Sequence, residues 1–221
     1  IAYDQLGMGY SSKPLDEDYR LSSRIAHLEE FVEHLNLKKV TLVVHDWGGA
    51  VGMGWAVKHA SRIQKIIIMN TAAFPSFHIP FRIRLLRNIW GGEFLIRNFN
   101  AFARPAVYMA VNKPLPANIR RGYLAPYSSS SERRGIARFV ADIPTTPHHP
   151  TYSVLSSIES SLRSLKVPKL LLWGMKDFCF HKGFLEKWCE IYPEAQVVPL
   201  EGAGHYLLED EPSRCENTIR H

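Results

Sequence analysis

The feature that most restricts the fold of this chain is a short apolar strand followed at once by a helix of small residues. Residues 40–44 form a run rich in β-branched side chains, which is typical of a central strand. Residues 48–59 include six Gly and Ala residues, so we expect a helix that packs closely against a sheet. A second apolar run at residues 63–69 follows after a short turn. Strand, helix and strand with such short connections predict a parallel sheet.

The same alternation returns near the end of the chain but is interrupted in the middle. Strands are expected at residues 169–173 and 195–200, with residues 1–3 as the end of another buried strand. Helices are expected at residues 22–35 (capped by Ser22 or Ser23), 154–165, 182–191 and from 209 onward. The middle of the chain has several prolines, helix-like apolar spacing and no clear strand. We therefore predict an α/β core in two parts, residues 1–72 and 153–221, with an inserted helical block at residues 73–152.

The net charge of +6 is concentrated in this helical block. Residues 73–152 contain 11 Lys and Arg against 3 Asp and Glu, whereas the rest of the chain has a balance of −2. Solvated helix faces explain such a distribution, and the alternative is a surface for an anionic membrane or an acidic partner enzyme. No zinc-finger spacing, RNP string or Lys/Arg-rich run accompanies it, so nucleic acid is not an expected partner.

Within the block, one segment combines large apolar side chains with several arginines. It spans residues 79–103 and includes Arg82, Arg84, Arg87 and Arg97. The simpler interpretation is a pair of helices packed on the core. The other is an apolar pocket lining with an Arg-rich face that lies on a membrane.

Composition and motifs give no indication of a membrane-spanning, a disulfide-linked or a metal-binding protein. No run of 18 apolar residues is present, so no membrane span is expected. Cys179, Cys189 and Cys215 lack metal-site spacing and indicate a reducing compartment. His148 and His149 are adjacent, and sequence neighbours rarely share one ligand face, so no metal site is expected. We expect a cytoplasmic protein that needs no cofactor, with peripheral membrane association as an alternative.

The junction between the first strand and the small-residue helix carries the first candidate for chemistry. Asp46 stands in the sequence Val-His-Asp-Trp-Gly-Gly, where a sharp turn exposes the side chain of a nucleophile. The backbone N–H of Trp47 and the helix dipole would both stabilise negative charge there. The alternative is an aspartate that only caps the helix.

Two further candidates follow later strands. Asp177 and His205 are both expected at the carboxyl edge of the sheet, where sites of parallel sheets lie. The chain order of nucleophile, acid and histidine is that of the α/β-hydrolase fold. A carboxylate nucleophile can displace a leaving group from an sp³ carbon, and His205, oriented by Asp177, would then activate water against the ester. The indole N–H of Trp47 would bind the leaving anion.

At these residues the sequence resembles the haloalkane dehalogenases and the related epoxide hydrolases of the α/β-hydrolase superfamily. The resemblance includes the nucleophile motif at residues 45–49 and the Gly-rich turn at residues 4–11. Other segments resemble the third dehalogenase subfamily, which includes the β-lactone decarboxylases of long-chain olefin biosynthesis; these are residues 70–74, 122–127, 138–144, 173–180 and 204–210. The resemblance implies that the helical block is a cap over the pocket. It also implies Asp177 as the acid, since Asn70, at the position used by another subfamily, is an amide.

In that family, three strands and a His-Gly-Asn-Pro-type loop precede the position of residue 1. The loop supplies a second oxyanion donor and, in dehalogenases, a halide-binding asparagine. The resemblance therefore implies that this sequence is a fragment of a longer protein and lacks the N-terminal strands.

Together, the residues and the resemblance predict an enzyme that uses Asp46 on an apolar alkyl substrate. The expected reaction is decarboxylation of a long-chain β-lactone to an alkene and CO2, with a haloalkane dehalogenase as the first alternative and an epoxide hydrolase as the second. Four cap tyrosines are candidates for polarising an epoxide oxygen: Tyr108, Tyr123, Tyr127 and Tyr152. An alternative of another class is a catalytically inactive binding protein of the same fold.

Overall fold

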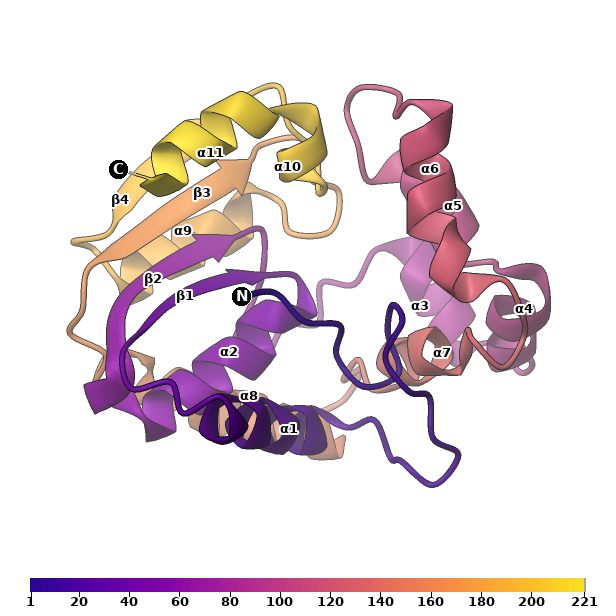
Figure 1. The fold of residues 1–221 in the computed structure, drawn as a ribbon, viewed down its shortest axis with the longest axis horizontal. Coiled ribbons are helices and arrows are strands. Elements are labelled where there is room, and N and C mark those ends of the chain that lie inside the picture. Colours follow the sequence, from indigo (N-terminus) through magenta and orange to yellow (C-terminus); the bar gives the residue numbers. More distant parts are fainter. Residues whose placement is uncertain (221) are drawn as a thin grey trace.

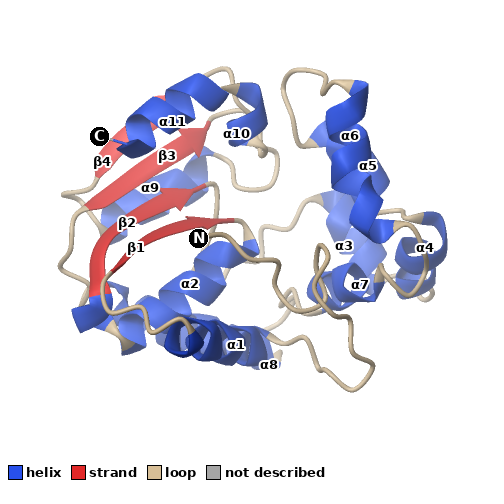
Figure 2. Ribbon diagram, in the orientation of Figure 1, coloured by secondary structure: helices blue, strands red, loops and turns tan. Residues whose placement is uncertain are grey.

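The strands of the computed structural model, which describes residues 1–220, form one four-stranded parallel sheet (Figure 2). In spatial order they are β1 (Val40–His45), β2 (Ile63–Met69), β3 (Lys169–Gly174) and β4 (Gln196–Leu200). The register pairs His45 with Met69 and Met69 with Leu172. The carboxyl ends of the strands therefore meet at one edge of the sheet, as expected for a site in a parallel sheet.

Helices cover both faces of this sheet (Figure 1). On one face lie α1 (Leu21–His34), α2 (Trp47–Lys58), α8 (Pro150–Leu162) and α9 (Lys182–Ile191). Their apolar side chains share one large core cluster with the strands. On the other face lie α10 (Leu207–Asp210) and α11 (Pro212–Arg220), which share a smaller apolar core cluster with the sheet. The 3₁₀ turn η1 (Ala60–Arg62) leads into β2. Because helices bury both faces of the sheet, the sequences of β2 and β3 are nearly continuous apolar runs.

A separate group of helices lies beyond the carboxyl ends of the strands, in the direction of the arrowheads in Figure 2. It contains α3 (Phe81–Asn88), α4 (Gly92–Phe99), α5 (Ala103–Met109), α6 (Ala117–Leu124), the 3₁₀ turn η2 (Ala125–Tyr127) and α7 (Arg134–Ala141). Ile96, Ile136, Ala137 and Val140 form a small core of its own. The described residues 70–149 contain no strand. We call this group the cap, and its limits at residues 73 and 152 remain a prediction.

The expected parallel sheet flanked by helices is confirmed, but two local expectations are wrong. Residues 1–3 are exposed and belong to no strand. Helix α1 begins at Leu21 instead of after Ser22 or Ser23, because the Asp142 carboxylate accepts a hydrogen bond from the Leu21 N–H at 2.9 Å. A side chain 121 residues away thus satisfies a free N–H of the first turn.

The packing of α2 against the sheet provides a stability test at two adjacent glycines. A Cβ added at Gly49 would lie 1.8 Å from the Thr71 hydroxyl oxygen, whereas one added at Gly48 would meet no atom within 4 Å. We expect Gly49→Ala to lower the free energy of unfolding by about 1–3 kcal/mol, because it overpacks this contact. Gly48→Ala is the matched control and should be neutral or stabilising by up to about 1 kcal/mol through helix propensity. Urea denaturation measures both, and equal destabilisation would contradict the packing argument.

Candidate active site

Asp46 occupies the sharp turn between β1 and α2, in a backbone conformation that few residues adopt. Its φ is 48° and its ψ is −129°, a combination that costs a non-glycine residue about 1–3 kcal/mol. Two contacts with the segment after β2 hold the turn. The Asp46 N–H donates to the Asn70 carbonyl at 3.2 Å, and the Thr71 hydroxyl donates to the Asp46 carbonyl. The strained turn leaves the Asp46 carboxylate at the wall of a cavity, beside the first turn of α2.

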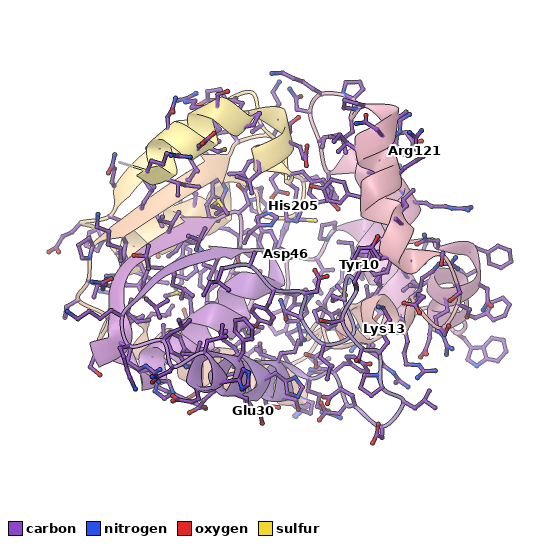
Figure 3. The ribbon with its side chains drawn as sticks, viewed as in Figure 1. Tyr10, Lys13, Glu30, Asp46, Arg121 and His205 are labelled. Carbon is purple, nitrogen blue, oxygen red and sulfur yellow. The ribbon has the colours of Figure 1, made fainter. Side chains whose placement is uncertain are left out.

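The structure brings Asp46, Asp177 and His205 together at the carboxyl edge of the sheet. Figure 3 shows Asp46 and His205 next to each other, between the sheet and the cap. Nδ1 of His205 donates to Oδ2 of Asp177 at 2.8 Å, and its Nε2 lies 3.8 Å from Oδ2 of Asp46. The Asp177 side chain is buried, and its other oxygen accepts the Cys179 N–H at 2.6 Å. The Asp46 side chain is 47% exposed. His205 therefore bridges one buried carboxylate and one that is open to the cavity.

The two carboxylates determine the charge of His205. Burial alone would lower its pKa, but the hydrogen bonds and charges of Asp177 and Asp46 raise the pKa to about 10. Desolvation would raise the pKa of Asp46, yet the His205 hydrogen bond and the charges of His205 and Arg24 bring that pKa below its ordinary value. At neutral pH the resting site is therefore an ionised Asp46 beside a protonated His205.

His45, which precedes Asp46, is a neutral neighbour of this site. Burial and the charge of His205 lower its pKa to about 4. Its Nε2 lies 2.9 Å from the carbonyl oxygen of His205, and because that oxygen only accepts, Nε2 carries the proton. His45 thus fixes the backbone of His205.

A buried arginine lies behind Trp47. The guanidinium carbon of Arg24, on α1, is 4.0 Å from the ring centroids of both Trp47 and Phe139. Its Nη2 donates to Asp142 at 2.6 Å. Burial lowers the pKa of Arg24 to about 10, against the opposing charge of Asp142, so the group stays cationic at neutral pH. Because cation–π attraction is strongest when the groups are desolvated, Arg24 holds the Trp47 indole beside Asp46.

An apolar cavity of about 360 Å³ lies over Asp46. Its walls come from both the core and the cap, and include Phe74, Leu86, Phe102, Ile136, Phe139 and Val140. Asp46, Trp47 and His205 contribute to the same wall. Tyr206 also lines the cavity, and burial raises its pKa to about 12, so its hydroxyl remains protonated. The cavity suits an alkyl substrate with a few polar atoms at one end.

The four cap tyrosines do not line this cavity. Tyr123 donates to Glu209 at 2.8 Å, the Tyr127 hydroxyl accepts the Gly9 N–H at 3.0 Å, and Tyr152 stacks on Phe77. Tyr108 is exposed. Tyr127 also lines a second cavity, of about 260 Å³, whose wall includes Asp46 and Trp47. The other three are packing or surface residues in this structure.

Asn70, the alternative acid position, has a structural role. Its Oδ1 accepts the Gly174 N–H at 2.6 Å and its Nδ2 donates to the Gly174 carbonyl at 3.0 Å. This amide therefore joins the ends of β2 and β3 with both of its polar atoms. Cys179 lines the cavity, but burial raises the pKa of its thiol, so it is neutral and a poor nucleophile.

Residues 1–220 contain neither a metal-binding cluster nor a membrane-spanning helix. No cluster of three or more His, Cys, Asp or Glu side chains there could hold a metal ion. In the same range, no helix has both the length and the apolar character of a membrane span. His149 accepts the Thr151 N–H at 3.2 Å and caps α8.

Arg24 and Tyr206 are the neighbours of the site that the sequence interpretation missed. Arg24 shares the buried face of α1 with Leu21, Ile25 and Leu28. A charge on such a face is the signal for a buried ion pair. Nothing in the sequence distinguishes Tyr206 from a packing residue.

Comparison with known proteins agrees with this arrangement. Residues 1–212 match the family described as alpha/beta hydrolase fold. The chain belongs to this family. It is 43% identical over 229 residues to cis-3-alkyl-4-alkyloxetan-2-one decarboxylase of Shewanella oneidensis, covering 100% of this chain and 72% of that protein. It is 39% identical to the decarboxylase of the same name from Xanthomonas campestris, covering 100% of this chain and 77% of that protein.

More distant similarity extends to dehalogenases. Haloalkane dehalogenase 2 of Mycobacterium tuberculosis is 27% identical over 99% of this chain and 76% of its own length. A crystal structure of a variant of haloalkane dehalogenase DatA from Agrobacterium tumefaciens superposes with a TM-score of 0.86 at 25% identity, covering 98% of this chain and 77% of that chain. Similarity to the α/β-hydrolase-fold dehalogenases and decarboxylases, expected from the motifs, is confirmed. The chain spans about three quarters of the length of these relatives.

The buried pair behind Trp47 yields a test of stability. We expect Arg24→Met to lower the free energy of unfolding by about 3–5 kcal/mol, because Asp142 remains buried without its partner charge. The double variant Arg24→Met/Asp142→Asn should recover part of this loss. Arg20→Met, at an exposed position one turn earlier, is the control and should stay near wild type. Urea denaturation is the measurement; an Arg24→Met protein as stable as wild type would refute the assignment.

The raised pKa of His205 predicts a pH dependence of stability. The pKa of histidine is about 6.5 in an unfolded chain, so the stabilisation from His205 is complete below that pH. It is lost as the pH rises through the folded value of about 10. Unfolding free energies between pH 6 and pH 10 should therefore fall less steeply in Asp177→Asn, which lacks one of the two carboxylates. The exposed control His34→Gln should keep the wild-type slope; identical slopes in wild type and Asp177→Asn would disprove the coupling.

Proposed function

We propose that this protein converts long-chain 3-alkyl-4-alkyl β-lactones to an alkene and CO2. The observation that carries the proposal is the Asp46 carboxylate, with His205 3.8 Å away, on the wall of a mainly apolar cavity. The 43% and 39% identities to two proteins named cis-3-alkyl-4-alkyloxetan-2-one decarboxylase support this substrate class.

The proposed reaction runs through Asp46 and consumes no water. The carboxylate attacks C4 of the lactone, and the bond between C4 and the ring oxygen breaks. This gives an ester between Asp46 and C4 and a free carboxylate on C3. The bond from C3 to that carboxylate then breaks and releases CO2. Its electron pair forms the C3=C4 double bond, and Asp46 leaves C4 as a carboxylate.

The surroundings of Asp46 favour both steps. The apolar walls solvate a carboxylate poorly, which favours its loss as neutral CO2. The protonated His205 stabilises Asp46 as it regains its negative charge, and Asp177 keeps that proton in place. The Trp47 indole can donate its N–H to the ring oxygen as the ring opens.

Haloalkane dehalogenase is the second candidate, and the pair of His205 and Asp177 favours it. Once Asp46 is an ester, only Asp177 still raises the pKa of His205, so the imidazole releases its proton to solvent more easily than in the resting site. The neutral imidazole can then activate water. Decarboxylation needs no such base. For the epoxide hydrolase, three of the four cap tyrosines line neither of the two cavities beside Asp46, and the hydroxyl of the fourth, Tyr127, accepts the Gly9 N–H. The compact arrangement of Asp46, Asp177 and His205 argues against an inactive binding protein.

A product assay distinguishes these reactions. The purified protein and its Asp46→Ala variant are incubated with a long-chain cis-β-lactone and, separately, with a 1-bromoalkane. We expect alkene from the lactone, detected by gas chromatography, and a loss of at least about a thousand-fold in Asp46→Ala, because a nucleophile removed from such a site costs several orders of magnitude. The control Glu30→Ala, at an exposed position of α1 that lines neither cavity beside Asp46, should retain alkene formation.

Three other outcomes of this assay would contradict the proposal in different ways. Bromide and alcohol from the bromoalkane, with little alkene from the lactone, would assign the dehalogenase. Alkene formation that persists in Asp46→Ala would rule out the covalent route. Absence of both products would leave the decarboxylase proposal without support.

A further inference from the structure

The first two cap helices expose large apolar side chains that the fold does not use. Helix α3 has no buried residue, and Phe81 and Leu85 on one of its faces are 76% and 47% exposed. Trp90, between α3 and α4, is 99% exposed. Phe94 and Phe99 of α4 are also exposed, and their ring centroids are 5.9 Å apart. We call these five residues the apolar rim. Five large apolar side chains exposed on two adjacent helices and the turn between them indicate an interaction surface.

The backbone geometry displays Trp90 to solvent. Gly91 has a φ of 90°, which favours glycine, and a Cβ at Gly92 would lie 1.9 Å from the Leu86 carbonyl oxygen. These two glycines make the tight turn that brings α4 back against α3. A tryptophan at the tip of such a turn adds no packing to the cap, so stability does not explain it.

Unpaired positive charge surrounds the apolar rim. Arg82, Arg84 and Arg104 are exposed, and none of them forms an ion pair within residues 1–220. Glu93, the acidic residue in the range 73–131, is already 3.2 Å from Arg97. Each cation near an anionic bilayer contributes about 1 kcal/mol to binding. Charge complementarity therefore selects an anionic surface.

The same helix α3 also forms part of the cavity wall. Ile83 and Leu86 line the cavity, on the side of α3 away from Phe81 and Leu85. Arg82 of α3 and Pro105 of α5 line the cavity and are exposed, and so are His78, just before α3, and Phe178 of the core. The cavity therefore reaches the surface at more than one place, and its opening at α3 lies on the helix that carries Phe81 and Leu85 of the apolar rim.

We propose that the apolar rim and its arginines dock the protein on an anionic lipid bilayer, with the cavity opening at α3 toward the lipid. Exposed aromatic side chains enter the interfacial region of a bilayer, and arginines beside them bind the anionic head groups. A lipid-soluble β-lactone then reaches Asp46 without crossing water. The substrate in this statement rests on the proposed function, whereas the docking rests on the surface alone.

Vesicle flotation without substrate tests the docking directly. The probes are vesicles of phosphatidylcholine alone and of an equal mixture with phosphatidylglycerol. We expect the protein to float with the mixed vesicles, to bind pure phosphatidylcholine much more weakly and to be released by high salt. Trp90→Ser/Phe94→Ser and Arg84→Glu/Arg104→Glu should each weaken binding by about ten-fold or more. Matched controls elsewhere on the surface, Leu15→Ser and Lys38→Glu/Lys58→Glu, should bind as wild type.

Quenching by brominated lipids reports where the tryptophan lies. Trp55, Trp173 and Trp188 are fully buried and Trp47 is half-buried at the cavity wall, whereas Trp90 is 99% exposed. Trp90 should therefore dominate the quenching, and Trp90→Phe should remove most of it. No flotation with mixed vesicles, equal loss in the controls, or quenching that survives Trp90→Phe would overturn the proposal. A dimer in solution that Trp90→Ser dissociates would assign the apolar rim to protein contact instead. Alkene formation from a short-chain, water-soluble β-lactone tests the proposed function separately, since it needs no vesicles.

Discussion

The turn between β1 and α2 holds Asp46 in a strained backbone conformation, and the packing of β2 and α2 maintains it. Its backbone conformation is unfavourable by itself, and the surrounding fold offsets the strain. Thr71 donates to the Asp46 carbonyl, and the indole N–H of the buried Trp188 donates to the Thr71 carbonyl at 2.8 Å. Gly49 lets α2 approach Thr71 closely. Asp46 is therefore connected to the core through β2 and α9, and its position is fixed by the fold itself.

The charged groups around this turn form two sets, one around His205 and one around Arg24, with different roles. His205 lies between two carboxylates, which keeps it protonated while Asp46 stays ionised. Arg24 lies between two aromatic rings and is bonded to Asp142, which fixes the Trp47 indole. Buried ion pairs contribute little net stability compared with apolar packing. Their presence on both sides of Asp46 is better explained by the orientation of the imidazole and the indole.

The parts of this arrangement that follow from chain order could be predicted from the sequence. Asp46, Asp177 and His205 come directly after strands, and parallel strands end at one edge, so their proximity follows from topology. The role of Asp142 as the partner of Arg24 and of the α1 N-terminus could not be predicted, because it depends on packing across more than 100 residues. The orientation of Tyr108 in the cap could not be predicted either, since short helices with apolar residues on several sides do not reveal which side faces the cavity.

Helix α3 contributes both to the wall of the cavity and to the exposed apolar rim of the cap. It has no buried residue and is held at its end by contacts such as the bond from Arg87 Nε to the Ile143 carbonyl at 3.1 Å. A short helix with so little buried surface is among the first elements to open locally. One face of α3 lines the cavity and the other carries Phe81 and Leu85. Contact with an apolar phase would cover that outer face, so binding at the surface and opening of the cavity at α3 would act on the same few residues.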